Sequence, residues 1–371
     1  MRASALCLAL LAAALAVPGT HASEGVLPLV AARAGFEPAL TAREFVFPAD
    51  HGPHPAFQHE WWYLTGHLVA ATGERFGFEL TFFRVALGTS AARAPQAGAS
   101  RWRAQQIYFA HFAVTDIGRG QFHSAERSAR GALGLAGAEV SPLRVWAQDW
   151  SLAAAGEHWQ IRAAEPGYAL TLTLTDAARV IANGDQGLSQ KSGDPRDASY
   201  YYSIPSLLAH GELVRDGQAL RVDGRAWLDR EWGSGALGAG QSGWDWFACQ
   251  LSDGSALMFY SLRRSDAALD PHSAGTWVGA DGGVRALGSH DVEIAVQSFW
   301  TSPRGGRYPA RWKLIVPALS LTLELTPVLA DQELAVRPRY WEGAVDITGA
   351  RAEHTLTGEG YAELVGYAHA R

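Results

Sequence analysis

Between residues 226 and 264, three carboxylic acids lie among several tryptophans, a combination that suits acid catalysis. The acids are Asp229, Glu231 and Asp245. A carboxyl group that loses water beside indole rings has its neutral form favoured, which prepares it to donate a proton near neutral pH. We therefore take these three acids as candidate catalytic residues.

A structural explanation of the same stretch stays open. Asp229-Arg230-Glu231 also fits an ion pair at a strand end, and the neighbouring tryptophans also fit a protein core. Buried charges gather in structural networks as well as in active sites. The spacing alone does not choose between the two.

A second group of polar side chains lies among prolines shortly before residue 61. Imidazole and carboxylate are ligands that zinc accepts, so His51, His54, His59 and Glu60 are donors of a suitable type. Two intervening prolines make their spacing unlike a helical His-x-x-x-His pair. We predict no metal here and keep His59 and Glu60 as candidate catalytic residues that orient a water molecule.

Ser189 and Lys191 have the residue types of a serine–lysine nucleophile pair. No Gly-x-Ser-x-Gly elbow surrounds Ser189, and the sequence gives no positioned third group. We expect instead that Ser189 makes a turn and that Lys191 pairs with Asp194.

Strands must position these candidates, because apolar and polar residues alternate with a period of two through most of the chain. No stretch combines a capping signal with a sustained helical period. The count of short segments predicts an antiparallel all-β fold, closed to remove its edges. The expected strands cover residues 61–69, 75–85, 105–115, 121–129, 150–154, 158–163, 168–174, 200–203, 222–229, 243–251, 256–262, 276–279, 291–300, 310–315, 319–325, 342–348 and 355–364.

The chain of 371 residues is long enough for two domains. A glycine-rich stretch at 233–243 is the expected boundary. We predict a signal peptide at 1–22, a weakly patterned leader at 23–44, one β-barrel domain at 45–235 and a second at 236–371.

The first residues predict export to the periplasm or the extracellular space. A basic residue, an apolar run and a small-residue end at Ala22 are typical of a secretory signal peptide. No later segment is long and apolar enough for a membrane helix. Removal of the signal leaves Cys249 without a disulfide partner in the chain. A net charge of -6 with no basic tract argues against nucleic acid as a partner.

Six short motifs, in this order, resemble those of the carotenoid 1,2-hydratase and AttH-like family. The resemblance extends from about residue 45 to the end of the chain. The motifs are His59-Glu60-Trp61-Trp62-Tyr63 with Gly66-His67-Leu68, Gly184-Asp185-Gln186-Gly187 with Ser189 and Lys191, Tyr200-Tyr201-Tyr202-Ser203, Asp229-Arg230-Glu231-Trp232-Gly233, Gly243-Trp244-Asp245-Trp246-Phe247 and Tyr340-Trp341-Glu342-Gly343.

This resemblance implies two lipocalin-like β-barrel domains in tandem, with the motifs gathered near the domain interface. The family includes hydroxyneurosporene synthase, which adds water to a terminal alkene of a carotenoid, and lipocalin-like cyclases that act on polyenes. Many members are known only as predicted secreted hydrolases. The resemblance implies no metal and no organic cofactor. The export signal makes this chain similar to the secreted AttH-like branch rather than to the intracellular carotenoid enzymes.

Two main functions follow as expectations. In the first, Asp229 or Asp245 protonates a carbon–carbon double bond of an apolar small-molecule ligand, and indole faces stabilise the cation. In the second, the protein is a carrier of such a ligand and does not change it. A secreted hydrolase is a third possible class of function. The sequence does not identify a transporter partner. The expected ligand-binding residues are Trp61, Trp62, Tyr63, Tyr201, Tyr202, Trp232, Trp244 and Trp246.

Overall fold

The computed structural model describes residues 35–88, 104–176, 179–235, 237–266 and 268–368. The predicted signal peptide at 1–22 and the first part of the leader lie outside the described residues. The described part of the leader packs on the first domain, where Ala39 joins the core and the backbone N–H of Glu37 bonds the carbonyl of Ala56 at 3.1 Å.

The first half of the described chain forms one antiparallel sheet of thirteen strands. Its order is β4-β3-β2-β1-β13-β12-β9-β8-β7-β6-β5, and β10 and β11 also pair with β12. The strands are β1 (His59–Ala70), β2 (Arg75–Ala86), β3 (Gln106–Asp116), β4 (Gln121–Arg130), β5 (Ala136–Val140), β6 (Leu143–Ala147), β7 (Trp150–Ala155), β8 (His158–Glu165), β9 (Tyr168–Asp176), β10 (Ile181–Ala182), β11 (Leu188–Gln190), β12 (Ala198–Arg215) and β13 (Gln218–Gly233).

A second antiparallel sheet of ten strands follows. Its order is β17-β16-β15-β14-β23-β22-β20-β19-β18, with β21 paired to β22. The strands are β14 (Gln241–Leu251), β15 (Ala256–Arg264), β16 (Ala274–Val278), β17 (Val284–Gly288), β18 (Glu293–Thr301), β19 (Arg307–Val316), β20 (Leu321–Pro327), β21 (Glu333–Leu334), β22 (Tyr340–Arg351) and β23 (His354–Val365). The short 3-10 helices η2 (Ala49–His51) and η4 (Pro317–Leu319) are the helical elements of the described residues.

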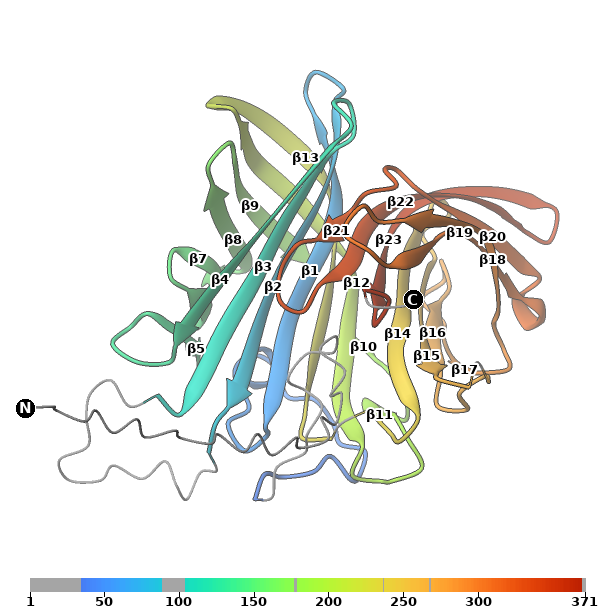
Figure 1. Ribbon diagram of the computed structural model, residues 1–371, viewed down its shortest axis with the longest axis horizontal. Helices are drawn as coiled ribbons and strands as arrows, with labels where there is room; N and C mark the ends of the chain where they lie inside the picture. Colours follow the sequence, from blue (N-terminus) through green and yellow to red (C-terminus); the bar gives the residue numbers. More distant parts are fainter. Residues whose placement is uncertain (1–34, 89–103, 177–178, 236, 267, 369–371) are drawn as a thin grey trace, which may run out of the picture.

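The two sheets curl in the same lipocalin-like manner but to different degrees (Figure 1). The first is nearly closed. Near the two ends of its strand order, Gln148, after β6, bonds the Ser128 carbonyl of β4 at 3.1 Å. The second is a half-barrel whose outer strand β18 is largely exposed. The predicted all-β fold with two lipocalin-like domains is confirmed. No helix of the described residues is long and apolar enough to cross a membrane.

Strand alternation gives each sheet one face toward its own core and one toward the other sheet. On β1, Trp62, Leu64 and Leu68 lie in the first core, whereas Tyr63 joins a cluster shared by both sheets. On β14, Phe247 lies in the second core and Trp246 in the shared cluster. The interface is therefore built from every second residue of the motif-bearing strands.

The long strand β12 differs from its prediction, which covered residues 200–203 alone. Pro205 follows that segment, and a proline argues against a central strand because it donates no ladder hydrogen bond. The structure accommodates it with an irregularity in the pairing to β13 between Ile204 and Leu207. Strand β12 then continues to Arg215 and brings Tyr201 to the interface.

Candidate active site between the two sheets

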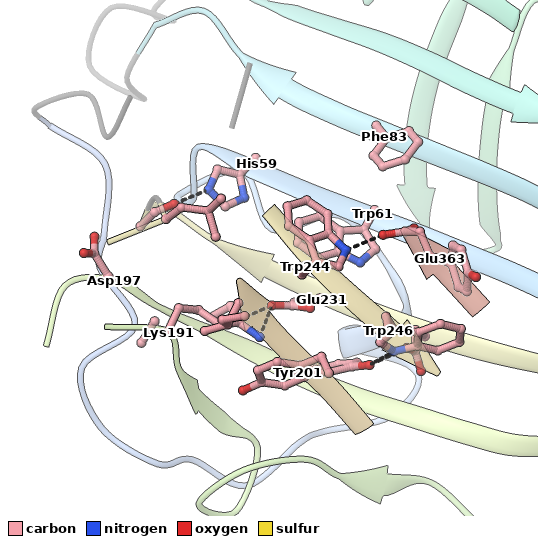
Figure 2. Close-up of a pocket in the computed structure, with 18 residues that line it drawn as sticks. His59, Trp61, Phe83, Lys191, Asp197, Tyr201, Glu231, Trp244, Trp246 and Glu363 are labelled. Atoms are coloured by element: carbon pink, nitrogen blue, oxygen red, sulfur yellow. Dashed lines mark hydrogen bonds and ion pairs between the residues drawn. The ribbon is translucent and has the colours of Figure 1, made fainter. Parts of the chain in front are cut away.

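A cavity of about 140 Å³ lies between the two sheets. Seven of its eighteen lining residues are Trp, Tyr or Phe, and the lining combines strands of both domains (Figure 2). A 150 Å³ cavity in a protein core holds benzene, so this one has room for about one ring or one short branched end group. The lining residues are His59, Trp61, Tyr63, Phe83, Lys191, Asp197, Ala198, Ser199, Tyr201, Asp229, Glu231, Gly235, Leu237, Trp244, Trp246, Tyr260, Leu262 and Glu363.

Asp229 is the most elaborately bonded acid of this cavity. Its Oδ1 accepts hydrogen bonds from Ser203 Oγ at 2.5 Å and from Trp227 Nε1 at 2.6 Å, and its Oδ2 accepts one from the Tyr201 hydroxyl. Burial raises the pKa of Asp229 to about 7, even though these donors favour the carboxylate. Trp246 Nε1 donates to Tyr201 Oη at 3.1 Å, which holds that ring against the acid. Asp229 is thus able to give or take a proton near neutral pH.

Lys191 and Glu231 form an ion pair on the cavity wall, with 3.2 Å between Nζ and Oε1. Ser199 Oγ donates to the same carboxylate oxygen. Burial opposes the charge of Lys191, but Glu231 and Tyr260 outweigh it and raise the pKa of the ammonium group. Figure 2 shows the pair beside Tyr201. A fixed ammonium–carboxylate pair of this kind can orient a water molecule or a ligand hydroxyl.

His59 adds a hydrogen-bond acceptor to the cavity. Its Nε2 lies 2.8 Å from the carbonyl of Gly235, and burial lowers the pKa of the imidazole to about 4. Because a carbonyl only accepts, Nε2 carries the proton and Nδ1 is an acceptor. Nδ1 is buried and meets no partner among the described residues.

Glu363 of β23 is a cavity acid that the sequence did not single out. Trp244 Nε1 donates to its Oε1, as Figure 2 shows. Burial raises the pKa of Glu363 to about 7, and the charges of Asp229 and Glu231 act in the same direction. The cavity therefore holds a second acid that is poised near neutral pH. Glu363 stands out only through its position opposite Glu342 on β22, and the sequence alone does not show which strands pair.

A third buried acid, Glu79 of β2, lies near Glu363, and burial raises its pKa to about 8. Its neutral form is favoured in the folded state, so its contribution to stability is present below its ordinary pKa and is lost as pH rises through about 8. We expect Glu79→Gln to remove this loss. The free energy of unfolding is measured in urea from about pH 6 to 9. The difference between the variant and the unmodified protein should increase in favour of the variant by up to ~1.4 kcal/mol per pH unit.

The exposed Glu157→Gln is the matched control for Glu79→Gln and should follow the unmodified protein at every pH. Parallel stability curves for Glu79→Gln and the unmodified protein would show that Glu79 is ionised in the folded state.

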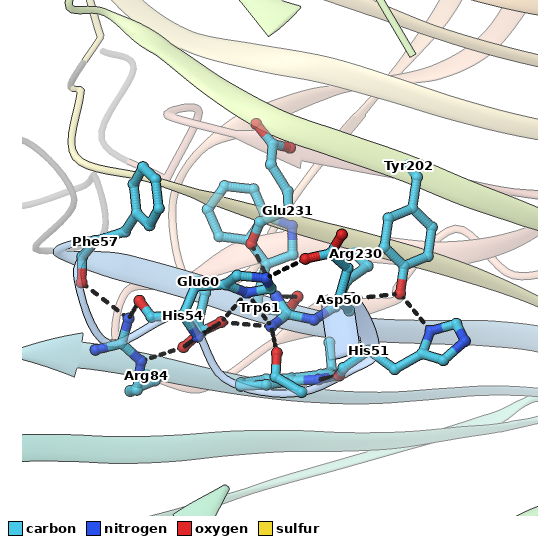
Figure 3. Close-up of polar contacts among 12 residues, drawn as sticks. Asp50, His51, His54, Phe57, Glu60, Trp61, Arg84, Tyr202, Arg230 and Glu231 are labelled. Carbon is cyan, nitrogen blue, oxygen red and sulfur yellow. Dashed lines mark hydrogen bonds and ion pairs between the residues drawn. The ribbon is translucent and has the colours of Figure 1, made fainter. Parts of the chain in front are cut away.

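Glu60 does not reach the cavity. It is fully buried on the opposite face of β1, where its Oε1 bonds Arg84 and its Oε2 bonds Arg230 (Figure 3). The two guanidinium groups overcome the effect of burial and hold the pKa of Glu60 well below its usual range. The structure therefore places this candidate in a structural ion network of the first domain.

Asp245 is also separated from Asp229. It lies on the second-core face of β14, bonds Arg263 at 3.2 Å and Tyr367 at 3.0 Å, and does not line the cavity. Burial raises the pKa of Asp245 to about 6. This acid therefore has a raised pKa, as Asp229 and Glu363 do, but it lies outside the cavity.

The aromatic candidates divide in the same way. Trp61, Tyr63, Tyr201, Trp244 and Trp246 line the cavity. Three others lie in the first domain's core: Trp62 packs under Arg230, Trp232 stacks on His54, and Tyr202 bonds His51 at 2.7 Å.

The positions of Ser189 and Lys191 differ from the two predictions made for them. Ser189 lies on β11 rather than in a turn, and Lys191 pairs with Glu231 rather than with Asp194. Lys191 Nζ does lie 2.9 Å from Ser189 Oγ. An ammonium group neutralised by Glu231 has no lone pair to accept the serine proton, and Ser189 does not line the cavity. This arrangement does not favour a serine hydrolase.

The histidines considered as metal donors have other partners. His54 lies between Asp50 and Glu60, at 3.0 and 3.2 Å, and His51 and His59 bond Tyr202 and Gly235. Within the part of the chain that the structure describes, no group of three or more histidine, cysteine or acidic side chains is arranged to hold a metal ion.

The AttH-like family model matches residues 38–367 of the chain. The chain belongs to the AttH-like family. A crystal structure of a putative AttH from Nitrosomonas europaea is 33% identical over 90% of this chain and 100% of that chain, with a TM-score of 0.80. No match was found among curated proteins.

A more distant structure shares the fold of this AttH-like protein. The crystal structure of kievitone hydratase from Nectria haematococca has a TM-score of 0.67 and 16% identity, covering 89% of this chain and 98% of that chain. At this identity the similarity establishes a common architecture alone.

Proposed function

We propose that this AttH-like protein adds water to a carbon–carbon double bond at the apolar end of a small-molecule ligand, with Asp229 as the proton donor. The observation that carries the proposal is a buried carboxyl group that three neutral donors hold in a cavity between two domains. Burial raises the pKa of this group to about 7. An arginine or lysine beside a buried carboxyl group would hold it in its ionised form. Asp229 instead receives neutral donors, which leave its proton exchangeable.

The reaction begins with transfer of the Asp229 proton to one alkene carbon. The O–H bond breaks, a C–H bond forms and the other carbon becomes a cation. Trp61, Trp244 and Trp246 line the cavity, and a desolvated cation–π contact with an indole face contributes about 2 kcal/mol. Water then attacks the cation and releases one proton. The polar groups that can hold this water are His59 Nδ1 and the Lys191–Glu231 pair.

The size of the cavity indicates the substrate class. Its volume admits a ring or a short branched alkene and not a whole long polyene, so an isoprenoid, polyene or lipid would place one end group inside. The existence of a hydratase on the same fold is compatible with this chemistry. A carrier of the same ligand is the competing function, and the largely apolar lining suits it equally.

Two measurements separate these functions. The purified protein is incubated with geraniol, farnesol and squalene in water labelled with heavy oxygen, and products are analysed by mass spectrometry. A labelled alcohol on at least one of these alkenes supports hydration. Native mass spectrometry of protein purified gently from its own cells gives the opposite test. Stoichiometric intact ligand, with no labelled product from that ligand, would identify a carrier.

We also propose that the protein acts after export, in the periplasm or outside the cell. The basic residue, apolar run and small-residue end of segment 1–22 support this. Cell fractionation with N-terminal sequencing tests it, and a mature protein beginning at Ser23 is expected. Retention of the full chain in the cytoplasm would contradict export.

A further inference from the structure

Glu363 and Glu342 face each other across the pairing of β22 and β23. They are direct partners in the register of these antiparallel strands. Their neighbours Ala344 and Tyr361 belong to the cluster shared by both sheets, so this face of the pair points toward the first domain. Glu363 borders the cavity, and Glu342 lies behind it with no exposed surface.

The hydrogen bonds of the two acids leave one carboxyl oxygen of Glu342 without a donor from the described residues. Trp244 donates to Glu363 Oε1, and the Tyr63 hydroxyl donates to Glu342 Oε1 at 2.6 Å. Glu342 Oε2 is buried and meets no donor from the other described residues. Strand pairing places the two carboxyl groups side by side on one face, and a hydrogen bond between carboxyl oxygens requires that one of them be protonated.

None of the ion pairs formed by the described residues includes Glu342, Glu363 or Glu79. Two close carboxylates without a cation cannot both ionise in a dry interface. The titratable groups whose charges act on the pair are Glu79 from β2, Tyr63 from β1, Asp229 and Glu231 from β13, Tyr340 from β22 and Tyr361 from β23.

We propose that Glu363 and Glu342 share one proton and that Glu363 is the base that takes the proton of the attacking water. This inference rests on the proposed hydration. The first domain then donates the proton through Asp229, and the second domain accepts it through Glu363. Glu363 is the catalytic residue of the pair, and Glu342 is a positioning residue that holds the shared proton.

The protons balance over one turnover. Asp229 loses one proton to the alkene carbon, and Glu363 gains one when the C–O bond forms. In total, the product has gained one hydrogen atom and one hydroxyl group, the elements of one water molecule. Transfer of a proton from Glu363 back to Asp229 restores the starting state. Burial raises the pKa of Glu363 to about 7 and that of Glu342 well above its usual range, which supports Glu342 as the group that keeps its proton.

Trp244 provides a substrate-free readout, because its indole N–H bonds Glu363 directly. Tryptophan is labelled with heavy nitrogen, and the indole N–H resonances are followed by NMR from about pH 5 to 9. Trp244→Phe assigns the relevant signal. We expect that signal to titrate with a midpoint near 7, and the titration to disappear in Glu363→Gln. Trp146, whose indole bonds the Gly134 carbonyl, is the internal control and should not follow.

Glu342→Gln tests the shared proton. The amide N–H still donates to Glu363, so the midpoint should stay within about half a pH unit if Glu342 is neutral. A fall of more than about one unit would mean that Glu342 is ionised and repels Glu363, which overturns the proposal. An invariant Trp244 signal in the unmodified protein would overturn it as well.

Turnover separates this inference from the proposed function. On any of the three alkenes that is hydrated, Glu363→Gln should lose about 10²- to 10⁴-fold activity and the limb of the pH profile that reports a base. Full activity in Glu363→Gln with loss in Asp229→Asn would discard Glu363 as the base and keep the hydratase. Full activity in both variants would discard the hydratase mechanism itself.

Discussion

Asp229→Asn is expected to lower the rate of alkene hydration by about 10²- to 10⁴-fold, the usual contribution of a positioned general acid. Asparagine keeps the size of the side chain and its acceptor oxygen for Ser203 and Trp227, but it has no transferable proton. The fold should therefore persist while the first step of the reaction is lost. Formation of labelled alcohol, measured as initial rate against pH, checks this.

The matched control is Asp245→Asn. Asp245 is also a buried acid with a raised pKa, about 6, but it bonds Arg263 and Tyr367 on the far face of β14. Its replacement should leave hydration largely unchanged. Equal losses in both variants would show that the raised pKa reflects stability alone, and the assignment of Asp229 would be wrong.

Glu60→Gln is expected to destabilise the folded protein by about 3–5 kcal/mol, because it leaves two buried guanidinium groups without their shared carboxylate. Arg84 and Arg230 have no exposed surface, and both bond Glu60. His54 loses a partner in the same step, since its Nδ1 lies 3.2 Å from Glu60 Oε2. Urea unfolding monitored by tryptophan fluorescence measures the change.

Glu324→Gln gives the comparison for Glu60→Gln. Glu324 pairs with Arg311 at 2.9 Å, but both side chains are more than two-fifths exposed, so the loss should stay below about 1 kcal/mol. A Glu60→Gln protein as stable as the unmodified one would mean that water or another group replaces the carboxylate. Loss of hydration at full stability would return Glu60 to the list of catalytic candidates.

The sequence determined the local features of this protein. The period of two placed Trp61 and Tyr63 on one face of β1 and Trp62 on the other, because a strand turns successive side chains to opposite sides whatever surrounds it. The same rule separated Asp245 from Trp244 and Trp246. The order of six motifs identified the family, and the absence of a sustained helical period predicted an all-β fold.

The tertiary structure decided which of these faces meet. Asp229 and Asp245 have similar neighbours in the sequence, yet one faces the cavity and the other the second domain's far side. Glu363 bonds a tryptophan 119 residues away, and Glu342 bonds a tyrosine 279 residues away. Such pairs are set by strand register and by the packing of two curved sheets, which are non-local and leave no periodic trace in the chain. Glu60 is the opposite case, since its motif led to a catalytic prediction that the structure does not support. Its buried ion pairs with Arg84 and Arg230 depend on strand pairing, which the sequence does not show.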